Sequence, residues 1–200
     1  MEGEWRSRVS VILPETLNST FRADQEVKMS TVILFNVQLV LGYVACLLLF
    51  RTYVLPRLRL MEMADAQRAI ATLHSFRFFG LVFILPGVVG PNLPASFTIS
   101  AAYGDFATGL LALAALLTVK RRPLYWVFVI AFNLVGVVDL VLNYYHAVRI
   151  GLPEMAGQLG AAYVIPIIYV PMLMITHVAA FYFLLRPQPK AEGGLVNQAA

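Results

Sequence analysis

The chain has 200 residues, of which 60% are hydrophobic and only 13% are charged, and its mean hydropathy is +0.75. This charged share is about half of that in soluble domains, so the composition excludes an ordinary soluble fold and predicts an integral membrane protein. The basic balance (isoelectric point about 9.4) does not indicate nucleic-acid binding, because the basic residues fall in short clusters between apolar runs. The single cysteine excludes an internal disulfide.

Five apolar runs are long enough for a transmembrane helix, which needs roughly 20 residues to cross a hydrocarbon core of about 30 Å. Their hydrophobicity is continuous, which favours helices over the alternating strands of a barrel. The sequence therefore predicts an all-α integral membrane bundle of five transmembrane helices, at about 32–50, 70–89, 97–119, 123–146 and 160–185.

Polar segments flank this five-span domain, which covers residues 29–187. Residues 1–28 carry five acidic and four basic residues and have no signal-peptide pattern. Met29 directly precedes the first span and is an alternative start, in which case residues 1–28 are not translated. Residues 188–200 are short and polar, and we expect them to form a disordered tail.

The basic residues of the connections predict the orientation of the spans, because cytoplasmic connections carry an excess of Lys and Arg. Nine lie on one side and one, Arg149, on the other; the nine are Arg51, Arg57, Arg59, Arg68, Lys120, Arg121, Arg122, Arg186 and Lys190. The N-terminus is therefore predicted outside and the C-terminus inside, in the inner or plasma membrane of a cell.

An outer polar group lies in the third and fourth spans. In the fourth, Asn133, Gly136, Asp139, Asn143 and His146 are spaced 3, 3, 4 and 3 residues apart and share one helix face. In the third, Asp105 follows Tyr103, and counting residues from the outer end places it at the depth of Asp139. Because two carboxylates close together in a low dielectric do not both ionise easily, we expect at least one to have a raised pKa or to share a proton with the other.

This outer polar group has three interpretations. Asp105 and Asp139 act only as hydrogen-bonding links between helices, or they form a proton-handling or ligand-binding site together with Tyr103, Asn133, Asn143 and His146. A metal site using Asp105, Asp139 and His146 is the third, but no helix carries a close pair of ligands, so no metal is predicted.

An inner polar group joins His74 and Arg77 in the second span to His177 in the fifth. In one interpretation the histidines are hydrogen-bonded and Arg77 extends its head to the cytoplasmic surface. In another, His74 and His177 are the axial ligands of a b-type haem, with Arg77 near the propionates. In a third, Arg77 binds an anionic lipid or substrate head group.

The fifth span contains Pro166 and Pro171, each of which removes a helical hydrogen bond. We therefore expect a kinked helix beside a small internal pocket.

The chain has no recognisable catalytic motif. We therefore predict a small multi-pass membrane protein without catalytic activity and without a resident cofactor: a transporter-like, proton-handling or accessory subunit. Its predicted partner is the lipid bilayer, and because five spans make a thin bundle, a homodimer or a larger membrane complex is expected. The alternative is a redox protein that binds haem or quinone through His74 and His177.

Overall fold

The computed structural model describes residues 15–186, which are almost entirely helical and contain no strand. The elements are α1 (Glu15–Leu49), the π-helix η1 (Phe50–Val54), α2 (Leu55–Leu60), α3 (Met63–Ser75), the 3-10 helix η2 (Phe76–Ile84), α4 (Ala95–Leu117), α5 (Arg122–Arg149), the 3-10 helix η3 (Leu152–Tyr163), the π-helix η4 (Ile165–Tyr169) and α6 (Val170–Leu185). Residues 15–28, expected as a polar segment, are the start of α1, whereas residues 1–14 and the predicted tail at 188–200 lie outside the described range.

Four helices are long and apolar enough to cross a membrane: Asp24–Leu60, Ala95–Leu117, Arg122–Arg149 and Ile165–Leu185. The second predicted span, 70–89, is not among them, because α3 changes into the 3-10 helix η2 at Phe76 and helical structure ends at Ile84. The backbone of η2 lies against α4, where a Cβ on Gly109 would stand 2.9 Å from the Phe78 nitrogen. This segment therefore differs from the uniform α-helix that the apolar run predicted.

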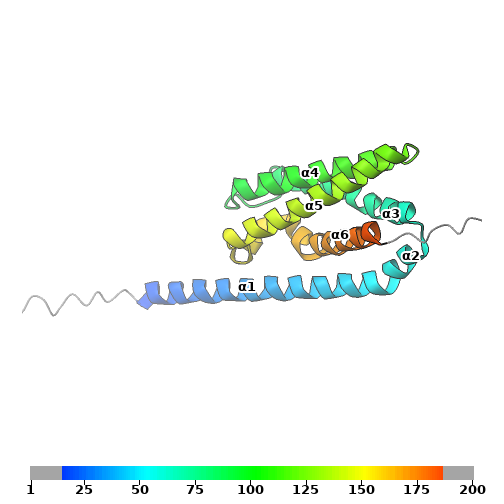
Figure 1. The fold of residues 1–200 in the computed structure, drawn as a ribbon. Helices are drawn as coiled ribbons and strands as arrows, with labels where there is room; N and C mark the ends of the chain where they lie inside the picture. Colours follow the sequence, from blue (N-terminus) through cyan, green and yellow to red (C-terminus); the bar gives the residue numbers. More distant parts are fainter. Residues whose placement is uncertain (1–14, 187–200) are drawn as a thin grey trace, which may run out of the picture.

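The elements lie side by side along one long axis (Figure 1). The last three long helices and α3–η2 pack together, whereas α1 runs along one edge of this group. In the long helix Asp24–Leu60, which includes most of α1, only 6% of the most apolar window is buried, against 39% for each of the other three long helices. A few contacts attach it: the Tyr163 hydroxyl donates to Gln38 Oε1 at 2.6 Å, and a Cβ on Gly42 would overlap the Ile167 carbonyl.

The predicted last span, 160–185, is interrupted. Gly160 has φ +52°, a conformation that favours glycine, inside η3. Pro166 is the second residue of the π-helix η4, at the start of the helix Ile165–Leu185, where a missing N–H leaves no helical bond unmade. Pro171 lies inside this continuous helix, where the π-helix η4 changes into α6, and it removes one helical hydrogen bond.

Two apolar cores pack the ends of the bundle. One is built around Phe50, Ile70, Tyr125, Phe132 and Phe183, and the other around Phe35, Phe83, Phe97, Leu159 and Ile165. The buried polar residues of the middle of α4 and α5 fall between these two sets along the chain.

Candidate functional site

Arg77 of η2 is the centre of a buried polar network, and its side chain has no exposed surface. Its Nε donates to Asp105 Oδ1 of α4 at 2.7 Å, and its Nη2 donates to Asp139 Oδ2 of α5 at 2.5 Å. The guanidinium presents its donors in a fixed planar fork. One arginine therefore holds a carboxylate on each of two neighbouring helices.

The third nitrogen of Arg77, Nη1, lies 3.3 Å from His177 Nε2 of α6 and donates to the Gly136 carbonyl at 3.4 Å. Because a guanidinium only donates, His177 Nε2 must accept. The ring proton is then on Nδ1, which donates to Asn133 Oδ1 at 3.0 Å. His177 is therefore neutral in this arrangement.

His74 of α3 extends the network, with its ring centre 4.1 Å from that of His177. Its Nε2 lies 3.0 Å from Thr176 Oγ1, whose own hydrogen goes to a backbone carbonyl in the preceding turn. His74 Nε2 is therefore the donor and the ring is neutral. Its Nδ1 is buried and has no hydrogen-bond partner among the described residues.

The charges of the network do not balance. Arg77 contributes one positive charge, while Asp105 and Asp139 contribute two negative charges and are only 7% and 8% exposed. Asn143 Nδ2 donates to Asp139 Oδ1 at 3.0 Å, which stabilises the carboxylate without neutralising it. Since an unbalanced buried charge is costly, the formal charge of −1 favours the binding of one proton or one cation.

Three glycines make room for the network. A Cβ on Gly80 would overlap the Asp105 carboxylate, and one on Gly104 would overlap that of Asp139. A Cβ on Gly136 would stand 2.5 Å from His177 Nε2 and 2.7 Å from Arg77 Nη1. A side chain at any of these positions would push the charged groups apart.

The structure merges the outer and inner polar groups, which the sequence had placed at different depths. Six of the nine predicted site residues are linked by hydrogen bonds or ring contact around a seventh, Arg77. Of the three interpretations of the inner group, the one in which Arg77 extends its head to the surface was wrong, because this side chain is fully buried. The six are Asp105, Asp139, Asn133, Asn143, His74 and His177. The two remaining residues lie elsewhere: Tyr103 is 57% exposed, and His146 lies two turns along α5 from Asp139.

Sequence reasoning missed the contribution of Gly80, and it did not connect the hydroxyl of Thr176 with the histidines. Gly80 follows Arg77 by three residues, the spacing of one 3-10 turn, and Thr176 directly precedes His177. The only sequence signal for Gly80 was its position, because a small residue one helical turn from a charged residue leaves space for the partners of that charge.

The histidines do not fit a haem. A porphyrin lies between its two axial ligands, but the rings of His74 and His177 are in direct contact and leave no space between them. Both rings are buried, so a quinone head group has no access to them either. Within residues 15–186 no three His, Cys, Asp or Glu side chains are grouped as metal ligands.

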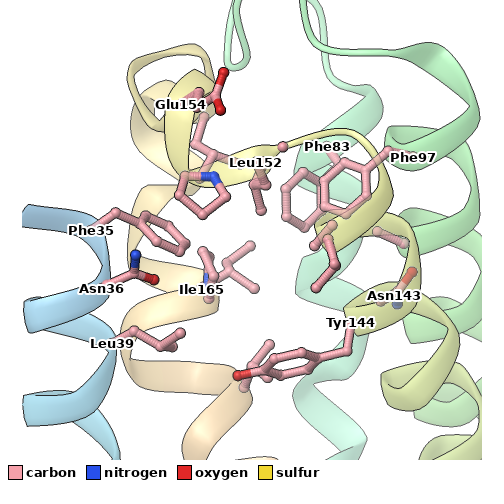
Figure 2. Close-up of a pocket in the computed structure, with 18 of the residues that line it drawn as sticks. Phe35, Asn36, Leu39, Phe83, Phe97, Asn143, Tyr144, Leu152, Glu154 and Ile165 are labelled. Atoms are coloured by element: carbon pink, nitrogen blue, oxygen red, sulfur yellow. The ribbon is translucent and has the colours of Figure 1, made fainter. Parts of the chain in front are cut away.

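A cavity of about 410 Å³ reaches the network (Figure 2). Asp105 and Asn143 lie at its lining, and Phe35, Asn36 and Leu39 of α1 form the opposite wall. A second cavity, of about 510 Å³, lies between α1 and the α3 and α6 helices and includes Thr176. The network therefore meets a cavity at each of two ends, through Asp105 and through Thr176.

Residues 34–185 match a family described as a domain of unknown function, DUF8737. The chain belongs to this family. The matched range contains every residue of the network described above. No curated protein and no solved structure matches the chain.

Proposed function

We propose that this DUF8737 protein is a multi-pass membrane protein of the cell membrane, in which the Arg77 network handles protons in a transporter-like role without catalysis. The spans are five, with the N-terminus outside and the C-terminus inside. Four long apolar helices and a surface rich in exposed Leu, Ile, Val and Phe support the membrane location.

The length of the α3–η2 segment supports a fifth span. A 3-10 helix rises about 2.0 Å per residue and an α-helix about 1.5 Å. The 13 residues of α3 and the nine of η2 therefore extend about 37 Å, which exceeds a hydrocarbon core of about 30 Å. The next helix, α4, begins at the end of the molecule opposite to α2, as this crossing requires (Figure 1).

The observation that carries the proton-handling role is the unequal charge around Arg77. A purely structural ion pair needs one carboxylate, whereas Arg77 holds two, Asp105 and Asp139. The cavity beside Asp105 gives a proton a way in. Intramembrane carboxylates with such access serve proton relays in pumps and transporters.

Infrared difference spectroscopy of the purified protein between high and low pH tests this role. A protonated carboxyl group has a carbonyl stretch that a carboxylate lacks. We expect a reversible band from a buried acid in the wild-type protein that is lost or shifted in Asp139→Asn and in Asp105→Asn. The control Asp65→Asn removes an exposed acid of α3 and should keep the band. If no such band distinguishes the wild type from either variant while the protein stays folded, the carboxylates only link helices.

We further propose that the protein acts as a homodimer or within a larger membrane complex. Five spans give a thin bundle, and α1 is covered on one side only. Mass measurement of the detergent-solubilised protein by light scattering should give more than one chain of 22.2 kDa per particle.

A further inference from the structure

The cavity beside Asp105 has apolar walls with aromatic rings from four elements. Phe35 comes from α1, Phe83 from η2, Phe97 from α4 and Tyr144 from α5 (Figure 2). Phe83 and Phe97 pack edge to face, with ring centres 5.9 Å apart. The faces of aromatic rings attract cations, and such cages recognise quaternary ammonium groups.

The charge of this cavity has one sign. Among the residues that the structure describes, its lining includes Asp105 and, at the rim, Glu154, and no Lys, Arg or His. The positive charge nearest to Asp105, on Arg77, is fully buried behind it and is shared with Asp139. A ligand in the cavity therefore meets a network with a formal charge of −1 and aromatic walls.

We propose that this cavity binds a small organic monocation with an apolar body, such as a substituted ammonium compound. The inference rests on the proposed function and names the substrate class of the same site. The cation balances the charge that the network otherwise leaves uncompensated, while its apolar body fills the space between α1 and α5. The volume of about 410 Å³ lies within the range of about 300–1,000 Å³ typical of small-molecule sites.

The probe is benzyltrimethylammonium, and its control is neopentylbenzene, which has the same shape with carbon in place of the charged nitrogen. Radiolabelled probe is bound to the purified full-length chain in detergent, and each compound is tested as a competitor. We expect saturable binding of one probe per chain that unlabelled benzyltrimethylammonium displaces and neopentylbenzene does not.

Two pairs of variants locate the site. Asp105→Asn should weaken binding at least about tenfold, because it removes the charge next to the cavity, whereas Asp65→Asn removes an exposed charge outside the cavity and should change binding less than about threefold. Ala147→Phe fills the cavity without changing charge and should abolish binding. Val141→Phe enlarges an exposed residue of the same helix, outside the cavity, and should bind like the wild type. The second pair keeps the test valid where Asp105→Asn does not fold.

If neopentylbenzene displaced the radiolabelled probe as well as benzyltrimethylammonium does, the proposal would be overturned, because the cavity would then bind apolar compounds without regard to their charge. Absence of saturable binding, or binding that survives Ala147→Phe, would also overturn it. The infrared experiment separates this result from the proposed function: a titrating buried acid without cation binding would reject the substrate class alone, and cation binding without a titrating acid would reject proton handling alone.

Discussion

Arg77 uses all three nitrogens of its guanidinium at once, two on carboxylates and one towards His177 and the Gly136 carbonyl. A lysine ammonium at the end of a flexible chain has no planar fork with which to reproduce these directions. The geometry of the network therefore depends on this one side chain, and its removal leaves two buried carboxylates without a counter-charge.

Arg77→Ala should destabilise the protein by about 3–5 kcal/mol, the cost of breaking a buried ion pair from one side. Denaturation in mixed micelles, followed by circular dichroism, measures the change. The control Arg68→Ala breaks an exposed pair with Asp65, at 3.3 Å, and should cost at most about 1 kcal/mol. Replacing all three charges together (Arg77→Met, Asp105→Asn, Asp139→Asn) should recover most of the loss. Equal stability of Arg77→Ala and Arg68→Ala would contradict the buried network.

The two buried histidines are expected to be opposite tautomers. The partners of His177 place its proton on Nδ1, and those of His74 place it on Nε2. Nitrogen-15 NMR of histidine-labelled protein distinguishes the two forms, and His177→Phe and His74→Phe assign the signals. A positively charged imidazole at neutral pH for either residue would contradict the arrangement around Arg77.

At the scale of elements, glycines set how closely the helices of the network approach. Gly80, Gly104 and Gly136 lie on η2, α4 and α5, and each faces a charged or histidine side chain of a different element. Small residues of this kind allow close contact between helices in membranes. The same contacts leave no space for a methyl group.

Gly104→Ala and Gly136→Ala should each destabilise the protein by about 1–3 kcal/mol, because the added methyl overlaps the Asp139 carboxylate or the His177 ring. Gly157→Ala is the control: nothing lies within 4 Å of its Cβ position, and its effect should stay within about 0.5 kcal/mol. Denaturation in mixed micelles, followed by circular dichroism, measures these changes. Tolerance of alanine at both buried positions would indicate a looser network than the one described.

The sequence located α4 and α5 within a few residues, because they are long, continuous apolar runs bounded by a proline and by basic residues. It misplaced Arg77 for a physical reason. The predicted membrane span began at 70, so Arg77 was counted near the cytoplasmic edge, from which its long side chain could reach the surface. The structure instead buries Arg77 among Asp105, Asp139 and His177, which come from three other helices. Hydropathy along one helix does not show which residues of other helices surround a side chain.

That Asp105 and Asp139 lie at the same depth in the bundle was predictable from the sequence, but their shared partner was not. Residue counting placed both carboxylates at one depth, and the structure brings both to Arg77. Their shared partner was not predictable, since the change from α-helix to 3-10 helix at Phe76 alters the face on which the following residues lie.

At the scale of the whole molecule, the chain passes repeatedly between two ends, with α1 at one edge (Figure 1). The connections at the two ends differ in their number of basic residues. Arg59 and Lys120 are exposed near one end, and Asn92 is exposed in the connection before α4. The side of the membrane on which each of these three positions lies determines the number of membrane crossings.

Single cysteines introduced at these positions, in a chain carrying Cys46→Ala, test the topology. An impermeant thiol reagent should label Asn92→Cys in intact cells, and Arg59→Cys and Lys120→Cys only after permeabilisation. This pattern requires α3–η2 to cross the membrane. Labelling of Arg59→Cys and Asn92→Cys from the same side would reduce the spans to four.

The network joins residues that are distant along the chain: Asp105, Asp139 and His177 lie 28, 62 and 100 residues after Arg77. At synthesis rates of about 5–20 residues per second, Arg77 precedes Asp139 by about 3–12 seconds. In the proposed five-span topology, the arginine enters the bilayer during that interval without both counter-charges, which is costly. In that topology we expect the growing chain to stay with the insertion machinery until α5 emerges, and we expect cellular quality control to remove shortened chains that end before α5.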